Sequence, residues 1–236
     1  MKGVINMANN MYPGLYLDID NGNPSLSTPN EPFSIQFAQT KESLECDTEL
    51  YKSFLDNAIS RFRHSKTYKQ YKSHLYNAGL DRCQVMGNIT EEMVGQRELE
   101  MHHNFITIHD IALMISKHIL STTGYLTTFD LVQLLKEEHK ANRIPLVMVC
   151  KTVHQLYHAN EEFILPASMC VGSWWELLEK YKYGITLDIA YKIIYFLNKS
   201  IELDNDKSKF PDGELLDLRN KVESWANYNQ YININN

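Results

Sequence analysis

The chain has 236 residues, of which 44% are apolar and 22% charged, and its formal net charge is −6. This apolar fraction is sufficient for a packed core, so a wholly disordered chain is excluded. The absence of any run of 18 apolar residues predicts a protein without a transmembrane helix and without membrane partners. The N-terminus lacks the apolar core of a secretory signal, and the four cysteines form no CxxC pair, so we expect reduced thiols and a cytoplasmic location.

Three regions are expected along the chain. Residues 1–47, rich in Pro, Asn and acidic residues, are predicted to form an irregular acidic arm with room for a short strand around Gly14–Asp18. Residues 48–200 are expected to form the main domain. Residues 201–236 are expected to contain a last amphipathic helix, Glu214–Ala226, followed by a polar, Asn-rich tail.

The first helix of the main domain is predicted over 48–78, because apolar residues from Tyr51 to Phe62 recur at i, i+3, i+4 and i+7, with Asp47 as its cap and Gly79 as its stop. Its second half interleaves tyrosines with basic side chains that suit phosphate groups. The net negative charge argues against a protein that coats nucleic acid in bulk through its charge, but it allows such a local basic face. The candidate nucleic-acid contacts are Arg61, Arg63, Lys66, Lys69 and Lys72; the alternative is a solvated helix paired with the acidic arm.

The remaining pattern predicts a mainly α, α+β fold. Alternation at Leu99, Met101 and His103 favours a strand, and 144–150 is a β-branched run of strand length. Thr107 with Asp110, and Thr127 with Asp130, have the spacing of capping boxes that begin helices. Further helices are expected from Thr152, over 173–183 and over 187–200.

Seven of the nine histidines fall between residues 102 and 158. His102 and His103 are adjacent at a predicted strand end, and His154 and His158 lie at i and i+4, on one face of a helix. Three imidazoles can hold a divalent ion and leave one position open, while a fourth can serve as a base near neutral pH. The other three, His109, His118 and His139, are interpreted as ordinary helix residues.

The segments LEMHH (99–103), NRIPLVMVC (142–150) and KTVHQLYH (151–158) together resemble the HNH, or His-Me finger, endonucleases, in the branch with a double histidine and a helical HxxxH. The resemblance covers roughly residues 80–160. It implies a small ββα-metal finger embedded among helices, in which two strands and a helix surround one divalent ion. The phage or mobile-element setting common for such nucleases rests on this analogy alone.

Carried over to this chain, the resemblance implies that His102, His154 and His158 hold the metal, that His103 is the general base, and that Asn142 orients the base or braces the loop. The implied activity is hydrolysis of nucleic-acid phosphodiester bonds, with DNA favoured over RNA and with one ion of Mg, Mn, Ni or Zn. Two departures stand out. No CxxC pairs flank the motif, so no structural zinc is expected, and a helical insertion near 107–140 separates the two strands.

Two other functions are compatible with the sequence. The chain can be a non-catalytic partner-binding protein on an HNH-derived scaffold, with a protein partner on its C-terminal half. There, the pair Trp174–Trp175 is typical of residues that pack in the core and also contact a partner. The His109–Asp110 dipeptide also occurs in HD-type phosphohydrolases, which require further ligands to converge on it. A capping box explains Asp110 more simply.

Overall fold

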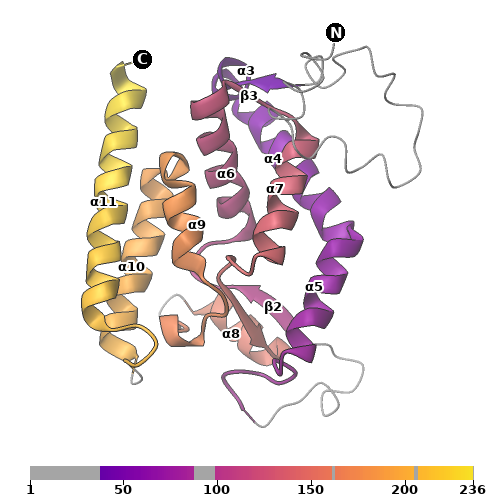
Figure 1. Ribbon diagram of the computed structural model, residues 1–236, viewed down its shortest axis with the longest axis vertical. Helices are drawn as coiled ribbons and strands as arrows, with labels where there is room; N and C mark the ends of the chain where they lie inside the picture. Colours follow the sequence, from indigo (N-terminus) through magenta and orange to yellow (C-terminus); the bar gives the residue numbers. More distant parts are fainter. Residues whose placement is uncertain (1–37, 88–98, 161–162, 205–206, 236) are drawn as a thin grey trace, which may run out of the picture.

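The computed structural model describes residues 38–87, 99–160, 163–204 and 207–235, and within them the protein is mainly helical with two short antiparallel sheets (Figure 1). The predicted α+β, mainly α class is confirmed. The N-terminal helices are α3 (Lys41–Cys46), α4 (Thr48–His64) and α5 (Lys66–Asn77), and the central ones are α6 (Ile108–Thr123), α7 (Thr128–Lys140) and α8 (Lys151–Ala159). The C-terminal helices are α9 (Trp174–Lys180), α10 (Leu187–Leu203) and α11 (Asp212–Asn235). None of the described helices combines the length and the apolar character needed to span a membrane.

Most of the predicted acidic arm, including the strand at Gly14–Asp18, lies outside the described residues. Its last part is regular, which corrects the expectation of an irregular segment up to residue 47. Gln39–Thr40 forms β1, which pairs antiparallel with β3 (Tyr125–Leu126), and α3 follows directly with a capping box at Thr40.

The helix predicted over 48–78 is two helices, α4 and α5, joined at Ser65. Ser65 has extended backbone angles, and its hydroxyl accepts a hydrogen bond from Tyr68 N, so it is the N-cap of α5. Asp47 caps α4 as predicted. The buried face of α4, from Tyr51 to Phe62, packs against α6 and α7.

Both predicted capping boxes are present. Thr107 and Asp110 begin α6, and Thr127 and Asp130 begin α7, each with the reciprocal side-chain to backbone hydrogen bonds. Helix α6 ends at Gly124, whose φ of 83° places it in the left-handed region that glycine adopts without strain.

The C-terminal helices form one side of the molecule, where α10 and α11 pack along each other (Figure 1). The predicted Asn-rich tail after Ala226 is wrong, because α11 continues to Asn235. Asn is a weak helix former, but Asn229 Nδ2 donates hydrogen bonds to the carbonyl oxygens of Lys182 and Ile185, which fixes this part of the helix against the core.

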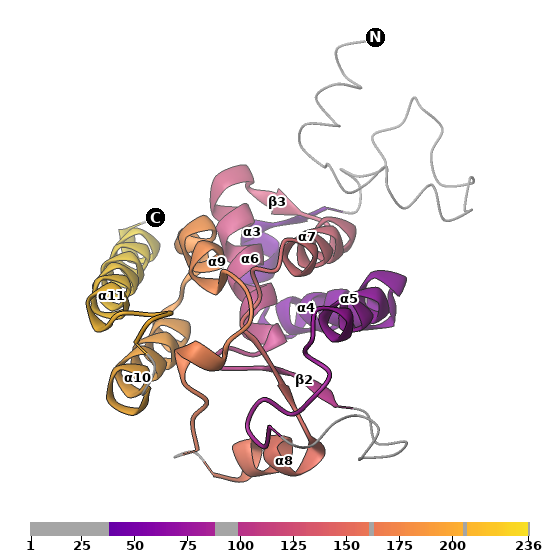
Figure 2. The same ribbon diagram turned by 60° about the horizontal axis from the view of Figure 1, so that its bottom comes forward.

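A small sheet lies at one end of the helices (Figure 2). Strand β2 (Glu100–His103) pairs antiparallel with β4 (Leu146–Val149), in a register that places His102 opposite Val147, and α8 packs on β2. The N-cap of α8 is Cys150, without a side-chain hydrogen bond, rather than the predicted Thr152. The sheet and α8 form a ββα unit, with α6, β3 and α7 inserted between its strands.

Candidate metal centre and basic groove

His102, His154 and His158 converge at the ββα unit. Strand β2 supplies His102, and one face of α8 supplies the other two because they are four residues apart. One nitrogen from each imidazole lies within 4.8 Å of the others. Among the residues that the structure describes, this is the one group of three or more potential metal ligands. We call these three residues the histidine trio.

Glu100, also on β2, orients one member of the trio. Its Oε2 lies 2.5 Å from Nδ1 of His154. A carboxylate beside Nδ1 favours the tautomer that has its proton on this nitrogen, which leaves the Nε2 lone pair for a metal ion. A carboxylate behind a ligating histidine is a common outer-shell arrangement in metal sites. No motif in the sequence marks Glu100 for this role.

His102 is the buried member of the trio, only 3% exposed, and its ring contacts Tyr157 with 4.1 Å between centroids. Its Nε2 is buried and has no hydrogen-bond partner among the described residues. Burial, assisted by the neighbouring His154 and His158, lowers the pKa of His102 to about 3. Burial also lowers the pKa of His154, against the opposing effect of Glu100. Both rings are therefore neutral near pH 7, the form that binds metal.

The spacing of His154 and His158 fits two ligands of one divalent ion. The Nε2 atoms of His154 and His158 are 3.2 Å apart, and two nitrogens bound to a tetrahedral zinc ion at about 2.05 Å would lie about 3.3 Å apart. His158 is exposed, so the site opens to solvent on its side. Three protein ligands with one open position are characteristic of catalytic rather than structural zinc sites.

His103 does not join the trio, which corrects its assignment as the base beside the metal. Strand β2 extends through His103, which pairs with Leu146, so His103 points to the opposite face of the strand from His102. There its ring lies 5.9 Å from that of buried His139, and its Nε2 is buried without a hydrogen-bond partner among the described residues. Burial, with His139 and Arg63 nearby, holds the pKa of His103 well below its ordinary value.

Asn142 also lies apart from the trio, in the turn between α7 and β4, with a φ of 56°. Its Oδ1 accepts a hydrogen bond from the Tyr71 hydroxyl at 2.8 Å, and its carbonyl oxygen accepts one from Ser173 N at 2.9 Å. A Cβ on Gly172 would lie 2.2 Å from that same carbonyl oxygen, so only glycine fits there. Asn142 thus braces a loop and orients no base.

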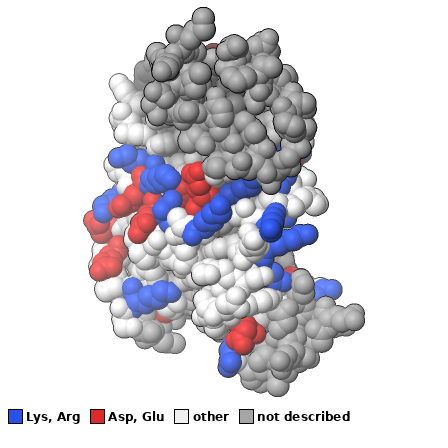
Figure 3. Space-filling model, turned by 45° about the vertical axis from the view of Figure 1, so that its right-hand side comes forward, with Lys and Arg blue, Asp and Glu red and all other residues white. Residues whose placement is uncertain are grey.

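A groove with a volume of about 990 Å³ runs beside the trio. Its walls carry four basic side chains, two tyrosines, one member of the trio and the carboxylate that contacts it. These residues are Arg63, Lys69, Lys72, Lys151, Tyr68, Tyr76, Glu100 and His154. Figure 3 shows Lys and Arg side chains gathered on this side of the molecule. We call this feature the basic groove.

Three of the five predicted nucleic-acid contacts, Arg63, Lys69 and Lys72, line the basic groove, whereas Arg61 and Lys66 do not. The Arg61 guanidinium lies over the ring of Phe129 instead, 5.4 Å from its centroid. Lys151, the first residue of α8, joins the groove. Lys151 belongs to no cluster of basic residues in the sequence, so it could not be predicted as part of the groove.

The remaining histidines lie outside the metal centre. His109 lies at the surface, 4.0 Å from Asp56, and the Asp110 carboxylate is held by Thr107 and by Lys192 at 2.7 Å. No further ligand converges on the His109–Asp110 pair among the described residues, so the HD-type interpretation has no structural basis.

Comparison of the chain with curated proteins and with solved structures gives no match. A family model does match, over residues 21–230, and its description is bacteriophage G278-like virion protein. The match covers the main domain, the histidine trio, the basic groove and most of α11. The chain therefore belongs to the G278-like family of bacteriophage virion proteins.

Proposed function

We propose that this virion protein is a metal-dependent nuclease of the HNH type, which binds a divalent ion at the histidine trio and hydrolyses nucleic-acid phosphodiester bonds, with DNA as the preferred substrate. Three imidazole ligands favour Zn or Ni over Mg, which prefers oxygen. In this proposal the protein is made in the host cytoplasm and carried in the particle.

The observation that carries the proposal is the continuity of the basic groove with the metal centre. His154 and Glu100 line the same groove as Lys69, Lys72 and Lys151. A phosphate backbone lying on the lysines would therefore pass the trio. Helix α8 adds to the attraction, because its first turn contains no acidic residue and its N-terminal N–H groups carry positive partial charge.

The residues of the groove and the trio have separate roles in this proposal. The basic side chains hold the backbone, the tyrosines offer faces on which bases stack, and Glu100 keeps His154 in the tautomer that binds metal. A divalent ion at the trio would supply Lewis acidity for the water nucleophile and for the charge that develops on the phosphate. His103 takes no part in this scheme.

The second candidate is a protein that binds nucleic acid or a partner without cleaving it, and the position of His103 favours it. A general base must lie within hydrogen-bond reach of the water that it activates. The imidazole that the HNH resemblance assigns to this role faces the core instead. In that case the trio and the basic groove would anchor nucleic acid within the particle.

A nicking assay on supercoiled plasmid separates the two candidates. The nuclease proposal expects nicking that requires Zn²⁺, Ni²⁺ or Mn²⁺, that stops with EDTA, and that falls at least about a hundredfold in His158→Ala, which loses a ligand. His109→Ala, an exposed histidine outside the trio, is the matched control and should keep full activity. Binding of a labelled oligonucleotide without nicking under every metal would refute the nuclease and support the second candidate.

The groove is tested separately by the salt dependence of oligonucleotide binding. Lys69→Ala and Lys151→Ala should each weaken binding and lower the slope of log K against log salt by about one, because each removes one phosphate contact. Lys140→Ala, at the exposed end of α7 and outside the groove, is the control. Equal slopes in all three variants would refute binding along this groove.

A further inference from the structure

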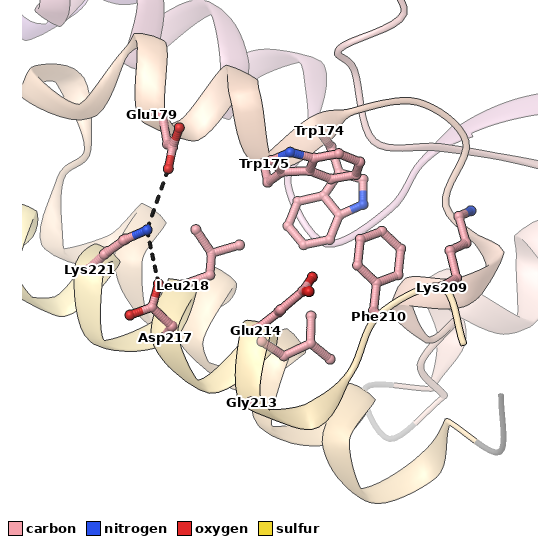
Figure 4. Close-up of a pocket in the computed structure, with 11 residues that line it drawn as sticks. Trp174, Trp175, Glu179, Lys209, Phe210, Gly213, Glu214, Asp217, Leu218 and Lys221 are labelled. Atoms are coloured by element: carbon pink, nitrogen blue, oxygen red, sulfur yellow. Dashed lines mark ion pairs between the residues drawn. The ribbon is translucent and has the colours of Figure 1, made fainter. Parts of the chain in front are cut away.

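A second cavity, of about 530 Å³, lies between α9 and α11 and shares no residue with the basic groove or the trio (Figure 4). Its floor is apolar and buried, formed by Trp174, Phe210, Leu215 and Leu218. Its rim is charged and exposed. The volume falls in the range of about 300–1,000 Å³ that is usual for ligand pockets.

Three aromatic rings form a continuous wall of this cavity. The centroids of Trp175 and Phe210 are 5.4 Å apart, those of Trp174 and Phe210 are 5.5 Å apart, and the two indoles meet edge to face at 5.9 Å. Trp174 is fully buried, whereas Trp175 keeps 36% of its surface exposed. An exposed indole face on a rigid wall attracts cations, because its π-electrons carry negative charge.

The charges on the rim leave one carboxylate without a counter-ion. The Lys221 ammonium lies 2.9 Å from Asp217 and 3.7 Å from Glu179. The Lys209 ammonium donates hydrogen bonds to the carbonyl oxygens of Ser168 and Cys170, and it lies over the Phe210 ring, 5.5 Å from its centroid. Glu214 extends from α11 toward the aromatic wall, and no Lys or Arg of the described residues pairs with it.

The floor contains one unsatisfied hydrogen-bond donor. Trp174 Nε1 is buried and has no acceptor among the described residues. Buried indole N–H groups are normally paired, because leaving one unpaired costs about 1–3 kcal/mol. Because this atom is enclosed, an occupant of the cavity does not reach it, and the features that select an occupant are Glu214 and Trp175, which favour a cation.

We propose that this cavity binds an arginine side chain of a partner protein. A planar guanidinium can stack on the Trp175 indole and donate two parallel hydrogen bonds to the Glu214 carboxylate, whereas an ammonium group can do neither in the same way. Arginine and tryptophan are also the side chains that most often dominate binding at protein interfaces.

Tryptophan fluorescence tests the site directly, since two of the three tryptophans of the chain line the cavity. The experiment uses the full chain with Trp225→Phe, in EDTA, so that its result is independent of the metal centre. The probe is a blocked Ala-Arg-Ala tripeptide. The comparison peptides carry citrulline, the neutral isostere of arginine, or lysine. We expect saturable binding of the arginine peptide in the millimolar range, at least about tenfold weaker binding of citrulline, and intermediate binding of lysine.

Two variants on the same helix locate the binding. Glu214→Gln should weaken binding of the arginine peptide about tenfold, whereas Glu223→Gln, which removes an exposed carboxylate outside the cavity, should leave it unchanged. Equal affinities for arginine and citrulline, equal effects of the two substitutions, or no saturation by about 10 mM peptide would each overturn the proposal. Unfolding transitions of both variants confirm that they remain folded.

Discussion

His139 makes the stability of the fold depend on pH. It lies on α7, has no exposed surface, and packs against Phe62 with 4.4 Å between ring centroids. Its Nδ1 donates a hydrogen bond to the carbonyl oxygen of Leu135 at 2.7 Å. Burial lowers the pKa of His139 to about 4, against the opposing effects of that hydrogen bond and of Glu138. Its ring is therefore neutral in the folded protein at every pH above about 5.

The expected magnitude follows from the two pKa values. Between about pH 6.5 and pH 4 the unfolded chain binds a proton at this residue and the folded chain does not, so acid favours unfolding. With a pKa of about 6.5 when unfolded and about 4 when folded, lowering the pH from about 7.5 to about 5 reduces the free energy of unfolding by about 2 kcal/mol. For a chain of this size, that corresponds to a fall in Tm of about 4–8 °C.

Denaturant unfolding of the metal-free protein in EDTA, at both pH values, measures this contribution. The variant His139→Asn keeps an N–H group near Leu135 O but cannot become protonated, and His139→Gln serves as a second such variant. Other groups contribute to acid destabilisation in all three proteins, so the difference between wild type and variant isolates His139. We expect the wild type to lose about 2 kcal/mol more than either variant. Equal losses would refute a buried, neutral His139.

Three further predictions concern the metal centre and the core. Zinc at a free concentration 100 times its Kd should raise the free energy of unfolding by about 2.7 kcal/mol, and His158→Ala should abolish this gain in a thermal-shift assay. Glu100→Ala should weaken zinc affinity about 10–100-fold in a competition titration, since Glu100 orients His154. Glu138→Ala should cost about 2–4 kcal/mol in urea unfolding, because this buried carboxylate binds Arg143, Lys180 and Tyr181 at 2.6–2.7 Å. Glu137→Ala, its more exposed neighbour, should cost less than about 1 kcal/mol.

The parts of the fold that follow local rules could be predicted from the sequence. The capping boxes at Thr107 and Thr127 depend on residues three positions apart, and both form. The trio was also predictable, because helical spacing fixes His154 relative to His158, and strand alternation leaves one histidine of the pair to face them. Bringing His102 to α8 then needed only the pairing of two short strands.

The features that the sequence did not predict depend on contacts between distant segments. The helix break at Ser65 has a local signal, a serine that caps the next turn, but the apolar pattern runs across it. The continuation of α11 past Ala226 rests on hydrogen bonds from Asn229 to η4 (Lys182–Gly184) and the residue after it, which no local pattern reveals. The contribution of Lys151 to the basic groove likewise requires α8 to lie beside α5.

The helical insertion explains why His103 faces the core. The insertion begins after β2 and ends before β4, and its second helix, α7, places His139 behind β2. Because α4 and α5 pack against α7, the face of β2 that carries His103 becomes core instead of an edge that a substrate could reach. The face that carries His102 is covered by α8, and the trio keeps its opening toward solvent at His158. The added helices thus leave the three histidines of the trio together and turn His103 toward the core, so in the proposed nuclease water activation would have to come from the ion and from groups on the α8 side.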